Sequence, residues 1–73
     1  MFEDKMIAGA ISGVMLDTGK TLNASLTQVQ ENCSAAEFER YRRIVARIMG
    51  EILVEVMNPI YATHPELKPD ELK

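Results

Sequence analysis

Few side chains of this chain could carry out nucleophilic or acid–base chemistry. Cys33 is the only cysteine and His64 the only histidine. No Ser/His/Asp, Cys/His or paired-carboxylate set occurs at a spacing that would fix its geometry. Two possible ligands also cannot make up the four of a structural zinc site. The sequence therefore predicts a protein that is not an enzyme and that binds no metal and no cofactor.

Both residues have simpler interpretations. Cys33 continues the apolar stripe of the first helical segment, so we expect it to be a small buried hydrophobic side chain. His64 lies between Thr63 and Pro65, which is typical of a surface turn.

The segment from Gly13 to Thr21 superficially matches a phosphate-binding loop. Five residues separate Gly13 from Gly19, whereas that motif has four between its glycines and follows a buried strand. A chain of 73 residues is also too short for a nucleotide-binding sheet. Nucleotide binding is not expected.

Arginines 40, 43 and 47 share one face of the second helical segment, where they could meet phosphates. Glu39 precedes Arg43 by four residues and Glu51 follows Arg47 by four, so neighbouring carboxylates offset much of this charge. The whole chain is acidic, with a net charge of −3. We expect a solvated face, and a nucleic-acid-associated regulator that uses Arg40, Arg43 and Arg47 is the alternative function.

Small residues recur at a spacing of four near the start of the chain. Gly9 and Gly13 form one such pair, and Ala8 and Ser12 form a second. Residues this small let another helix approach closely. The two glycines lie on the far side of the helix from Ile7, so we expect them to form a second contact surface.

The first helical segment carries an apolar stripe whose spacings of three and four residues match the period of an α-helix. Its members are Ile7, Ile11, Met15, Thr18, Leu22, Leu26, Val29 and Cys33. Because the stripe keeps its phase across Gly19, it predicts one long helix from about residue 3 to 32. A break near Gly19, which would give three helices, is the alternative.

The second helical segment begins with a capping box, in which Ser34 and Glu37 satisfy each other's free backbone N–H groups. We expect it to end at residue 57, because Pro59 disfavours helical geometry in the residue before it. Its apolar stripe comprises Phe38, Tyr41, Val45, Ile48, Ile52 and Val56, and Ile44, Met49, Leu53 and Met57 widen it. A face this wide is more than one partner helix can cover.

The remaining residues, 58–73, contain all three prolines and predict an irregular tail. We expect it to lie as a strap across the end of the bundle, anchored by its apolar side chains. These anchors are Ile60, Tyr61, Leu67 and Leu72. A docking peptide for another protein is the alternative.

These features predict a single all-α domain over residues 1–73, built as a long helical hairpin that pairs with its own copy into a four-helix bundle. Hydrophobic residues make up 47% of the chain, and a chain this short without a disulfide commonly needs a partner chain. We expect Arg42, which lies within the apolar arc, to reach the dimer contact. The residues expected in this packing face are Gly9, Gly13, Phe38, Tyr41, Arg42, Val45, Ile48, Met49, Ile52 and Val56.

The function that follows is a protein–protein interaction module that acts as a homodimer with an unidentified protein partner. A small-molecule pocket between the helices, lined by Met15, Tyr41 and Met49, is a further alternative. The apolar run from Met6 to Leu16 has 11 residues, against roughly 20 for a membrane-spanning helix. With an acidic start in place of a basic signal and a free thiol, we expect a cytoplasmic protein that does not associate with membranes.

Overall fold

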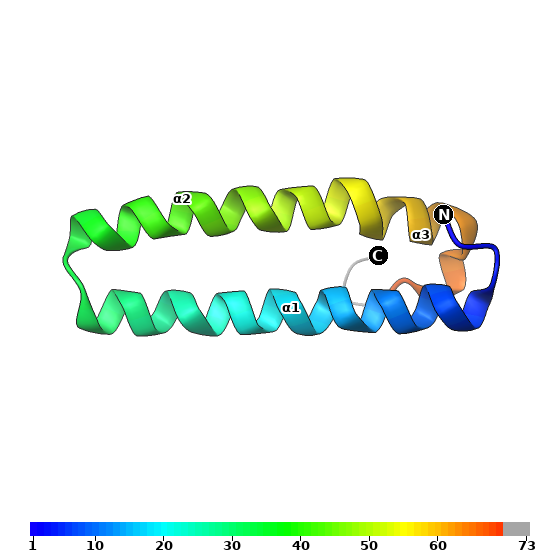
Figure 1. Ribbon diagram of the computed structural model, residues 1–73, viewed down its shortest axis with the longest axis horizontal. Coiled ribbons are helices and arrows are strands. Elements are labelled where there is room, and N and C mark those ends of the chain that lie inside the picture. The colour runs from blue at the N-terminus through cyan, green and yellow to red at the C-terminus, as the bar shows by residue number, and fades with distance from the viewer. Residues whose placement is uncertain (70–73) are drawn as a thin grey trace.

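The computed structural model describes residues 1–69, which contain helices and turns and no strand. Two long antiparallel helices lie side by side and are joined by a tight turn (Figure 1). In chain order the elements are α1 (Lys5–Asn32), α2 (Ala35–Glu51), the π-helical segment η1 (Ile52–Met57), α3 (Asn58–Thr63) and the 3-10 turn η2 (Pro65–Leu67). The prediction of an all-α fold is confirmed.

Helix α1 is one continuous helix through Gly19, as the unbroken phase of its apolar stripe predicts. It begins at Lys5, two residues later than expected, because Asp4 caps it. The Asp4 carboxylate accepts hydrogen bonds from the backbone N–H groups of Met6, at 2.8 Å, and Ile7, at 3.4 Å. An acidic side chain at this position accepts hydrogen bonds from two backbone N–H groups that have no partner within the helix. Its negative charge also interacts favourably with the positive end of the helix dipole.

The start of α2 is also set by a cap. The Ser34 hydroxyl oxygen accepts a hydrogen bond from the Glu37 N–H at 3.2 Å, which is the first half of the predicted capping box. The Glu37 carboxylate accepts a 3.3 Å bond from the Ser34 hydroxyl instead of from the Ser34 N–H. Cys33 and Ser34 both have extended backbone geometry, so two residues suffice to reverse the chain direction.

The prediction that the second helix ends at residue 57 is wrong, because the chain stays helical past Pro59 to Thr63. Proline lacks the N–H that would bond to the carbonyl of Glu55, and in a regular α-helix its ring would collide with that carbonyl. The wider turn of η1 comes directly before it, and the Asn58 N–H bonds to the carbonyl of Leu53, five residues back. We infer that this π-helical turn makes room for the proline ring.

The π-helical segment also changes which side chains face α1. At about 100° per residue, Tyr61 would lie about 160° around an uninterrupted α-helix from Val45, on the opposite side. A π-helical turn holds about one more residue than an α-helical turn, which turns the following residues back by about 100°. Val45, Met57 and Tyr61 are all buried, which requires this change of phase.

The main core therefore lies at one end of the hairpin, where α3 packs against the start of α1. Its buried residues are Ala8, Met57, Ile60 and Tyr61, with Ile11, Met15, Ile52, Val56 and Leu67 packed around them. Ser12 is buried beside it, and its hydroxyl lies 3.4 Å from that of Tyr61. A second pair, Ser25 and Tyr41, joins the two helices nearer the connecting turn with a 2.7 Å hydrogen bond.

The buried seam of α1 differs in part from the predicted stripe. Ala8 and Ser12 are the buried residues of α1, whereas Ile7, Thr18 and Cys33 are exposed. The reason is steric: the large side chains come from α3, and small residues on α1 leave room for them. The small-residue spacing noted in the sequence thus provides a contact within one chain.

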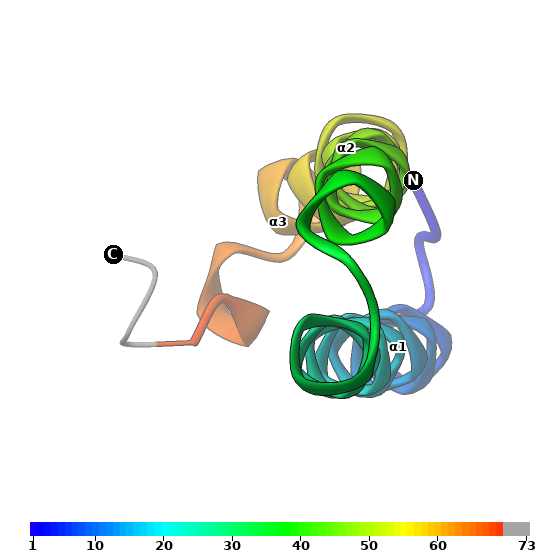
Figure 2. The ribbon, with the colours of Figure 1, turned by 90° about the vertical axis from the view of Figure 1, so that its left-hand side faces the viewer.

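The hairpin is a single layer of helices, with principal extents of 45 × 20 × 16 Å. Its radius of gyration is 14.5 Å, against about 11 Å for a compact domain of this length. The N-terminal residues lie on one side of the layer and η2 on the other (Figure 2). The predicted irregular tail is thus helical over most of residues 58–67; its Leu72 anchor lies outside the described residues, and the strap across a dimeric bundle stays a prediction.

Replacing Gly19 by alanine is expected to raise the free energy of unfolding by about 0.5–1 kcal/mol, the usual gain in a helix interior. The added Cβ would lie 3.7 Å from the Met49 methyl carbon, an ordinary van der Waals contact. Denaturant unfolding at one fixed protein concentration measures the change. Gly13→Ala, whose Cβ would have no neighbour within 4 Å in the described part of the chain, should give a similar gain. A loss of stability at Gly19 alone would show that the packing against α2 is tighter than described.

Candidate interaction surfaces

A groove of about 430 Å³ runs between α1 and the α2–η1 helix on one side of the layer. Its lining is mostly apolar, and among residues 1–69 only Lys20 and Asn23 bring a charge or an amide to it. The lining residues are Met15, Leu16, Gly19, Lys20, Asn23, Met49, Gly50, Ile52, Leu53 and Met57. Of the predicted small-molecule pocket, Met15 and Met49 line this groove, whereas Tyr41 does not.

The opposite side of the layer carries a second apolar surface. Val14 precedes Leu16 by two residues, which places it about 200° around α1 from this residue of the groove. Ile48 stands in the same relation to Gly50 on α2. Four aliphatic residues lie on this side, and we name them the aliphatic face: Ile7, Val14, Ile44 and Ile48.

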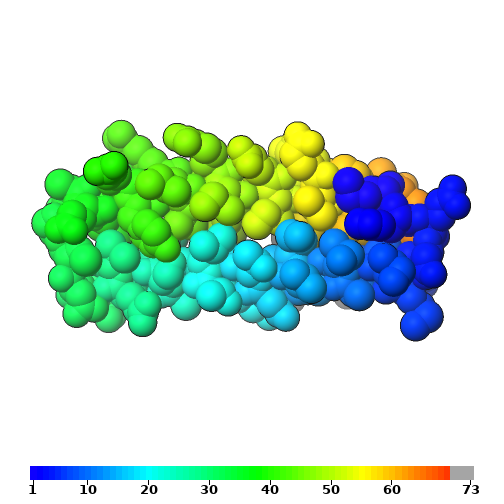
Figure 3. All heavy atoms as spheres, viewed as in Figure 1, coloured from blue at the N-terminus to red at the C-terminus, as the bar shows by residue number. Residues whose placement is uncertain are grey.

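The aliphatic face is uncovered over most of its length. The exposed fractions are 50% for Ile7, 54% for Val14, 41% for Ile44 and 40% for Ile48. Figure 3 views this side, and the N-terminal residues cross only its α3 end. A row of half-exposed aliphatic side chains along a helical layer is typical of a surface that another chain covers.

The predicted packing face divides into two groups. Six of its members contribute to the packing between the helices or to the groove, with Val45 fully buried and the others half-buried: Phe38, Tyr41, Val45, Met49, Ile52 and Val56. Ile48 is the large apolar member that remains exposed. The hairpin itself thus covers much of the surface that the sequence assigned to a second copy.

The two glycines of that face also have different surroundings. A Cβ on Gly9 would lie 3.8 Å from Leu67 of η2, so at this position the chain's own C-terminal turn makes the close approach. A Cβ on Gly13 would have no neighbour within 4 Å among residues 1–69. The close approach of a helix from another chain stays a prediction for Gly13 only.

Arg42 makes its closest polar contact within its own helix, where its guanidinium bonds to the Glu39 carboxylate. Arg43 lies 3.7 Å from the same carboxylate. The hydrogen bond from Arg42, assisted by the positive charges of both arginines, lowers the pKa of Glu39 below the usual carboxyl range. Two of the four α2 arginines are therefore held beside one acid.

The predicted arginine face is exposed, as expected for a solvated surface. Arg40, Arg43 and Arg47 border a shallow depression with Ala36, Glu39 and Ile44. The pair of Glu39 with Arg43 is confirmed. The expected pair of Arg47 with Glu51 is absent among residues 1–69, where no ion pair of either residue occurs within 4.0 Å.

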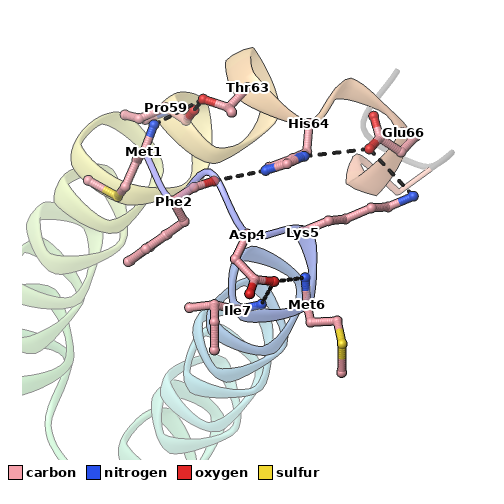
Figure 4. Close-up of polar contacts among 10 residues, drawn as sticks. All are labelled: Met1, Phe2, Asp4, Lys5, Met6, Ile7, Pro59, Thr63, His64 and Glu66. Atoms are coloured by element: carbon pink, nitrogen blue, oxygen red, sulfur yellow. Dashed lines mark hydrogen bonds and ion pairs between the residues drawn. The ribbon is translucent and has the colours of Figure 1, made fainter.

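At the α3 end, a polar cluster joins the N-terminal residues to the C-terminal turn (Figure 4). The His64 Nε2–H donates a 2.8 Å hydrogen bond to the carbonyl of Phe2, and the backbone of Phe2 is in the left-handed region. Glu66 lies 3.6 Å from the other ring nitrogen and 3.5 Å from the Lys5 ammonium. His64 lies in the turn between α3 and η2, as predicted. Its side chain is only 12% exposed, so the expectation that it lies at the surface is wrong.

Cys33 is exposed at the connecting turn, which corrects the expectation that it is buried. The helix ends one residue before it and its backbone is extended, so its side chain leaves the apolar stripe. Within residues 1–69, no group of three or more His, Cys, Asp or Glu side chains is arranged to hold a metal ion. In the same range, no helix is both long enough and apolar enough to cross a membrane.

No protein-family model, no curated protein and no solved structure matches this chain.

Arg42→Gln is expected to raise the pKa of Glu39 toward its ordinary value of 4.5, because it removes the hydrogen bond that lowers it most. Carboxyl carbon NMR titration measures this pKa directly. Because the pKa of Glu39 is lower in the folded protein than in the unfolded chain, its carboxylate stabilises the fold at pH values above the ordinary carboxyl pKa. This stabilisation is lost as the pH falls through the lowered pKa. Arg43→Gln should raise the Glu39 pKa less, and Arg47→Gln should leave it unchanged; an equal effect of all three would show a diffuse field in place of the hydrogen bond.

Proposed function

We propose that this protein is a non-enzymatic interaction module that acts as a homodimer. Two hairpins pair through their aliphatic faces into a four-helix bundle, and the outward surfaces meet an unidentified protein partner. One observation carries the proposal: four large aliphatic side chains, each at least 40% exposed, lie along one side of a single helical layer.

The size of the layer supports pairing. Its broad side measures 45 by 20 Å, an outline of about 900 Å². A stable protein interface buries about 800 Å² on each partner. One hairpin laid on another therefore offers the area that a specific dimer needs, and residues that the monomer leaves half-exposed would supply its centre.

The thin core supports it too. Only five apolar residues are buried in residues 1–69: Ala8, Val45, Met57, Ile60 and Tyr61. Stable domains are built from at least two packed layers of secondary structure around a core, and this chain supplies one. A second copy would provide the missing layer, and in that bundle the segment from Pro59 onward would form the proposed strap at one end.

The nucleic-acid alternative is less favoured by the charges along α2. Arg40, Arg43 and Arg47 are followed on the same helix surface by Glu51 and Glu55. A phosphate backbone that follows this surface would meet two carboxylates after three arginines, which opposes binding. We place the protein in the cytoplasm, where reducing conditions would keep the exposed Cys33 thiol free.

Ile48→Asp is expected to give a folded protein that no longer dimerises. The side chain is 40% exposed in the hairpin, so the new carboxylate would stay hydrated in the monomer, whereas in the dimer it would lie unpaired in an apolar contact. Light scattering after size exclusion, over a range of concentrations, gives the mass, and circular dichroism gives the helix content.

Leu16→Asp is the matched control, because Leu16 is an exposed aliphatic residue of the groove on the opposite side. It should leave the dimer intact. The wild-type protein should have twice the mass of one chain, and a wild-type monomer at all concentrations would refute the homodimer. Loss of the dimer in Leu16→Asp alone would show that the hairpins pair through the groove.

The groove supports a second candidate function, the binding of a small apolar molecule, because its volume of about 430 Å³ lies within the range of ligand pockets. A ligand copurified with the protein should appear as added mass in a native mass spectrum. Gly19→Leu, which would fill the groove beside Met49, should remove that mass, whereas Gly13→Leu should not. A wild-type spectrum of the bare chain, also after incubation with lipid extracts, would count against this candidate.

A further inference from the structure

A strip of six neighbouring residues runs along the side of α2 and η1 that borders the aliphatic face. Five of them follow one another at intervals of three or four residues, and the sixth, Ile48, lies four residues after Ile44 and three before Glu51. Each member is therefore next to another on the helix surface. We name these residues the charged strip: Arg40, Ile44, Arg47, Ile48, Glu51 and Glu55. The contact of Arg40, Ile44 and Arg47 with one shallow depression confirms that the first half is continuous.

The charges on this strip are separated along its length. Arg40 and Arg47 lie toward the connecting turn, and Glu51 and Glu55 lie toward α3. All four are exposed. Among residues 1–69, none of them has an ion pair within 4.0 Å. The strip thus has a positive end and a negative end. Of its two exposed isoleucines, Ile44 lies between Arg40 and Arg47, and Ile48 lies between Arg47 and Glu51.

We propose that the charged strip fixes the orientation of the homodimer: the α2 helices of two copies pair antiparallel, across a two-fold axis close to Ile48. This inference rests on the proposed function, because it specifies how the proposed dimer is arranged. The occupant of the strip is a second copy of this chain, since the strip is complementary to itself.

The positions of the charges define the axis. The interval from Arg40 to Glu55 is centred between residues 47 and 48, and the interval from Arg47 to Glu51 is centred at residue 49. Both centres lie within one residue of Ile48. A two-fold axis there would place Arg40 opposite Glu55 and Arg47 opposite Glu51 of the other copy, within reach of these long side chains.

Symmetry makes each of these contacts occur twice, as in any isologous interface. A parallel arrangement would instead set arginine beside arginine and glutamate beside glutamate, and like charges at such positions disfavour pairing. Charges that flank an apolar contact thus select the orientation, while Ile44 and Ile48 supply the contact itself.

Crosslinking tests the orientation directly. Two full-length variants are made in a Cys33→Ser background, one with Arg40→Cys and one with Glu55→Cys. The axial rise of 1.5 Å per residue separates these positions by roughly 22 Å on one helix, beyond a short bismaleimide. The variants are treated with that reagent separately and as an equimolar mixture, and peptide mass spectrometry identifies the linked positions.

The antiparallel dimer predicts that the 40–55 link forms in the mixture at least about tenfold above the 40–40 and 55–55 links. A predominance of 40–40 and 55–55 links would overturn the orientation while leaving the homodimer in place. Twice the chain mass by light scattering, with none of these links, would show pairing through another surface. A single-chain mass would refute the proposed function, and the orientation with it.

Charge reversal provides an independent test with the natural cysteine in place. Arg47→Glu should raise the dimer dissociation constant about tenfold, because two attractions become repulsions. Addition of Glu51→Arg should bring the dissociation constant most of the way back to the wild-type value, because the two residues would again carry opposite charges. Lys20→Glu, an equal change of charge at the groove, should leave the constant nearly unchanged. If the double variant binds no better than Arg47→Glu, these two residues do not face each other.

Discussion

The packing of Tyr61 against Ala8 and Ser12 is the contact on which the rest of the fold depends. It requires small residues on α1, a large side chain on α3, and a change of helix phase in between. The π-helical turn of η1 supplies that change and precedes the proline that would otherwise interrupt the helix. One local widening of the helix therefore closes the hairpin and sets the position of its core.

Concentrating the core at one end has a consequence for the rest of the layer. Two helices bury a single seam, and beyond α3 the contact between α1 and α2 consists of the buried Val45, the half-buried residues of the seam and the Ser25–Tyr41 hydrogen bond. Other aliphatic side chains extend to either side of the seam, some toward the groove and some toward the aliphatic face. Because the hairpin is a single layer of helices, neither of its broad sides is covered by a second layer, which limits the stability of one chain. The same uncovered sides are its two candidate binding surfaces.

The sequence predicts the parts of this fold that depend on local rules. The phase of the apolar stripe predicts the long α1, and the Ser34 capping box predicts the start of α2. The helical passage through Pro59 and the cover over His64 could not be predicted, because both depend on contacts between residues far apart in the chain. The burial of Ser12 is a similar case, since only the position of Tyr61 gives its hydroxyl a partner. For the candidate site, residue types alone indicated a wide apolar face on α2, but its division between hairpin seam, groove and aliphatic face required the structure.

The two kinds of residue along α2 would have separate effects on a dimer. Half-exposed Ile44 and Ile48 contribute apolar contact in any orientation, because burial of apolar area is not directional. The charges beside them contribute little net affinity at an exposed rim, yet their signs distinguish antiparallel from parallel pairing. A dimer built this way uses one side of the layer, so the groove on the other side stays open. The interaction module would then carry two copies of the groove, facing away from each other, for a partner outside the bundle.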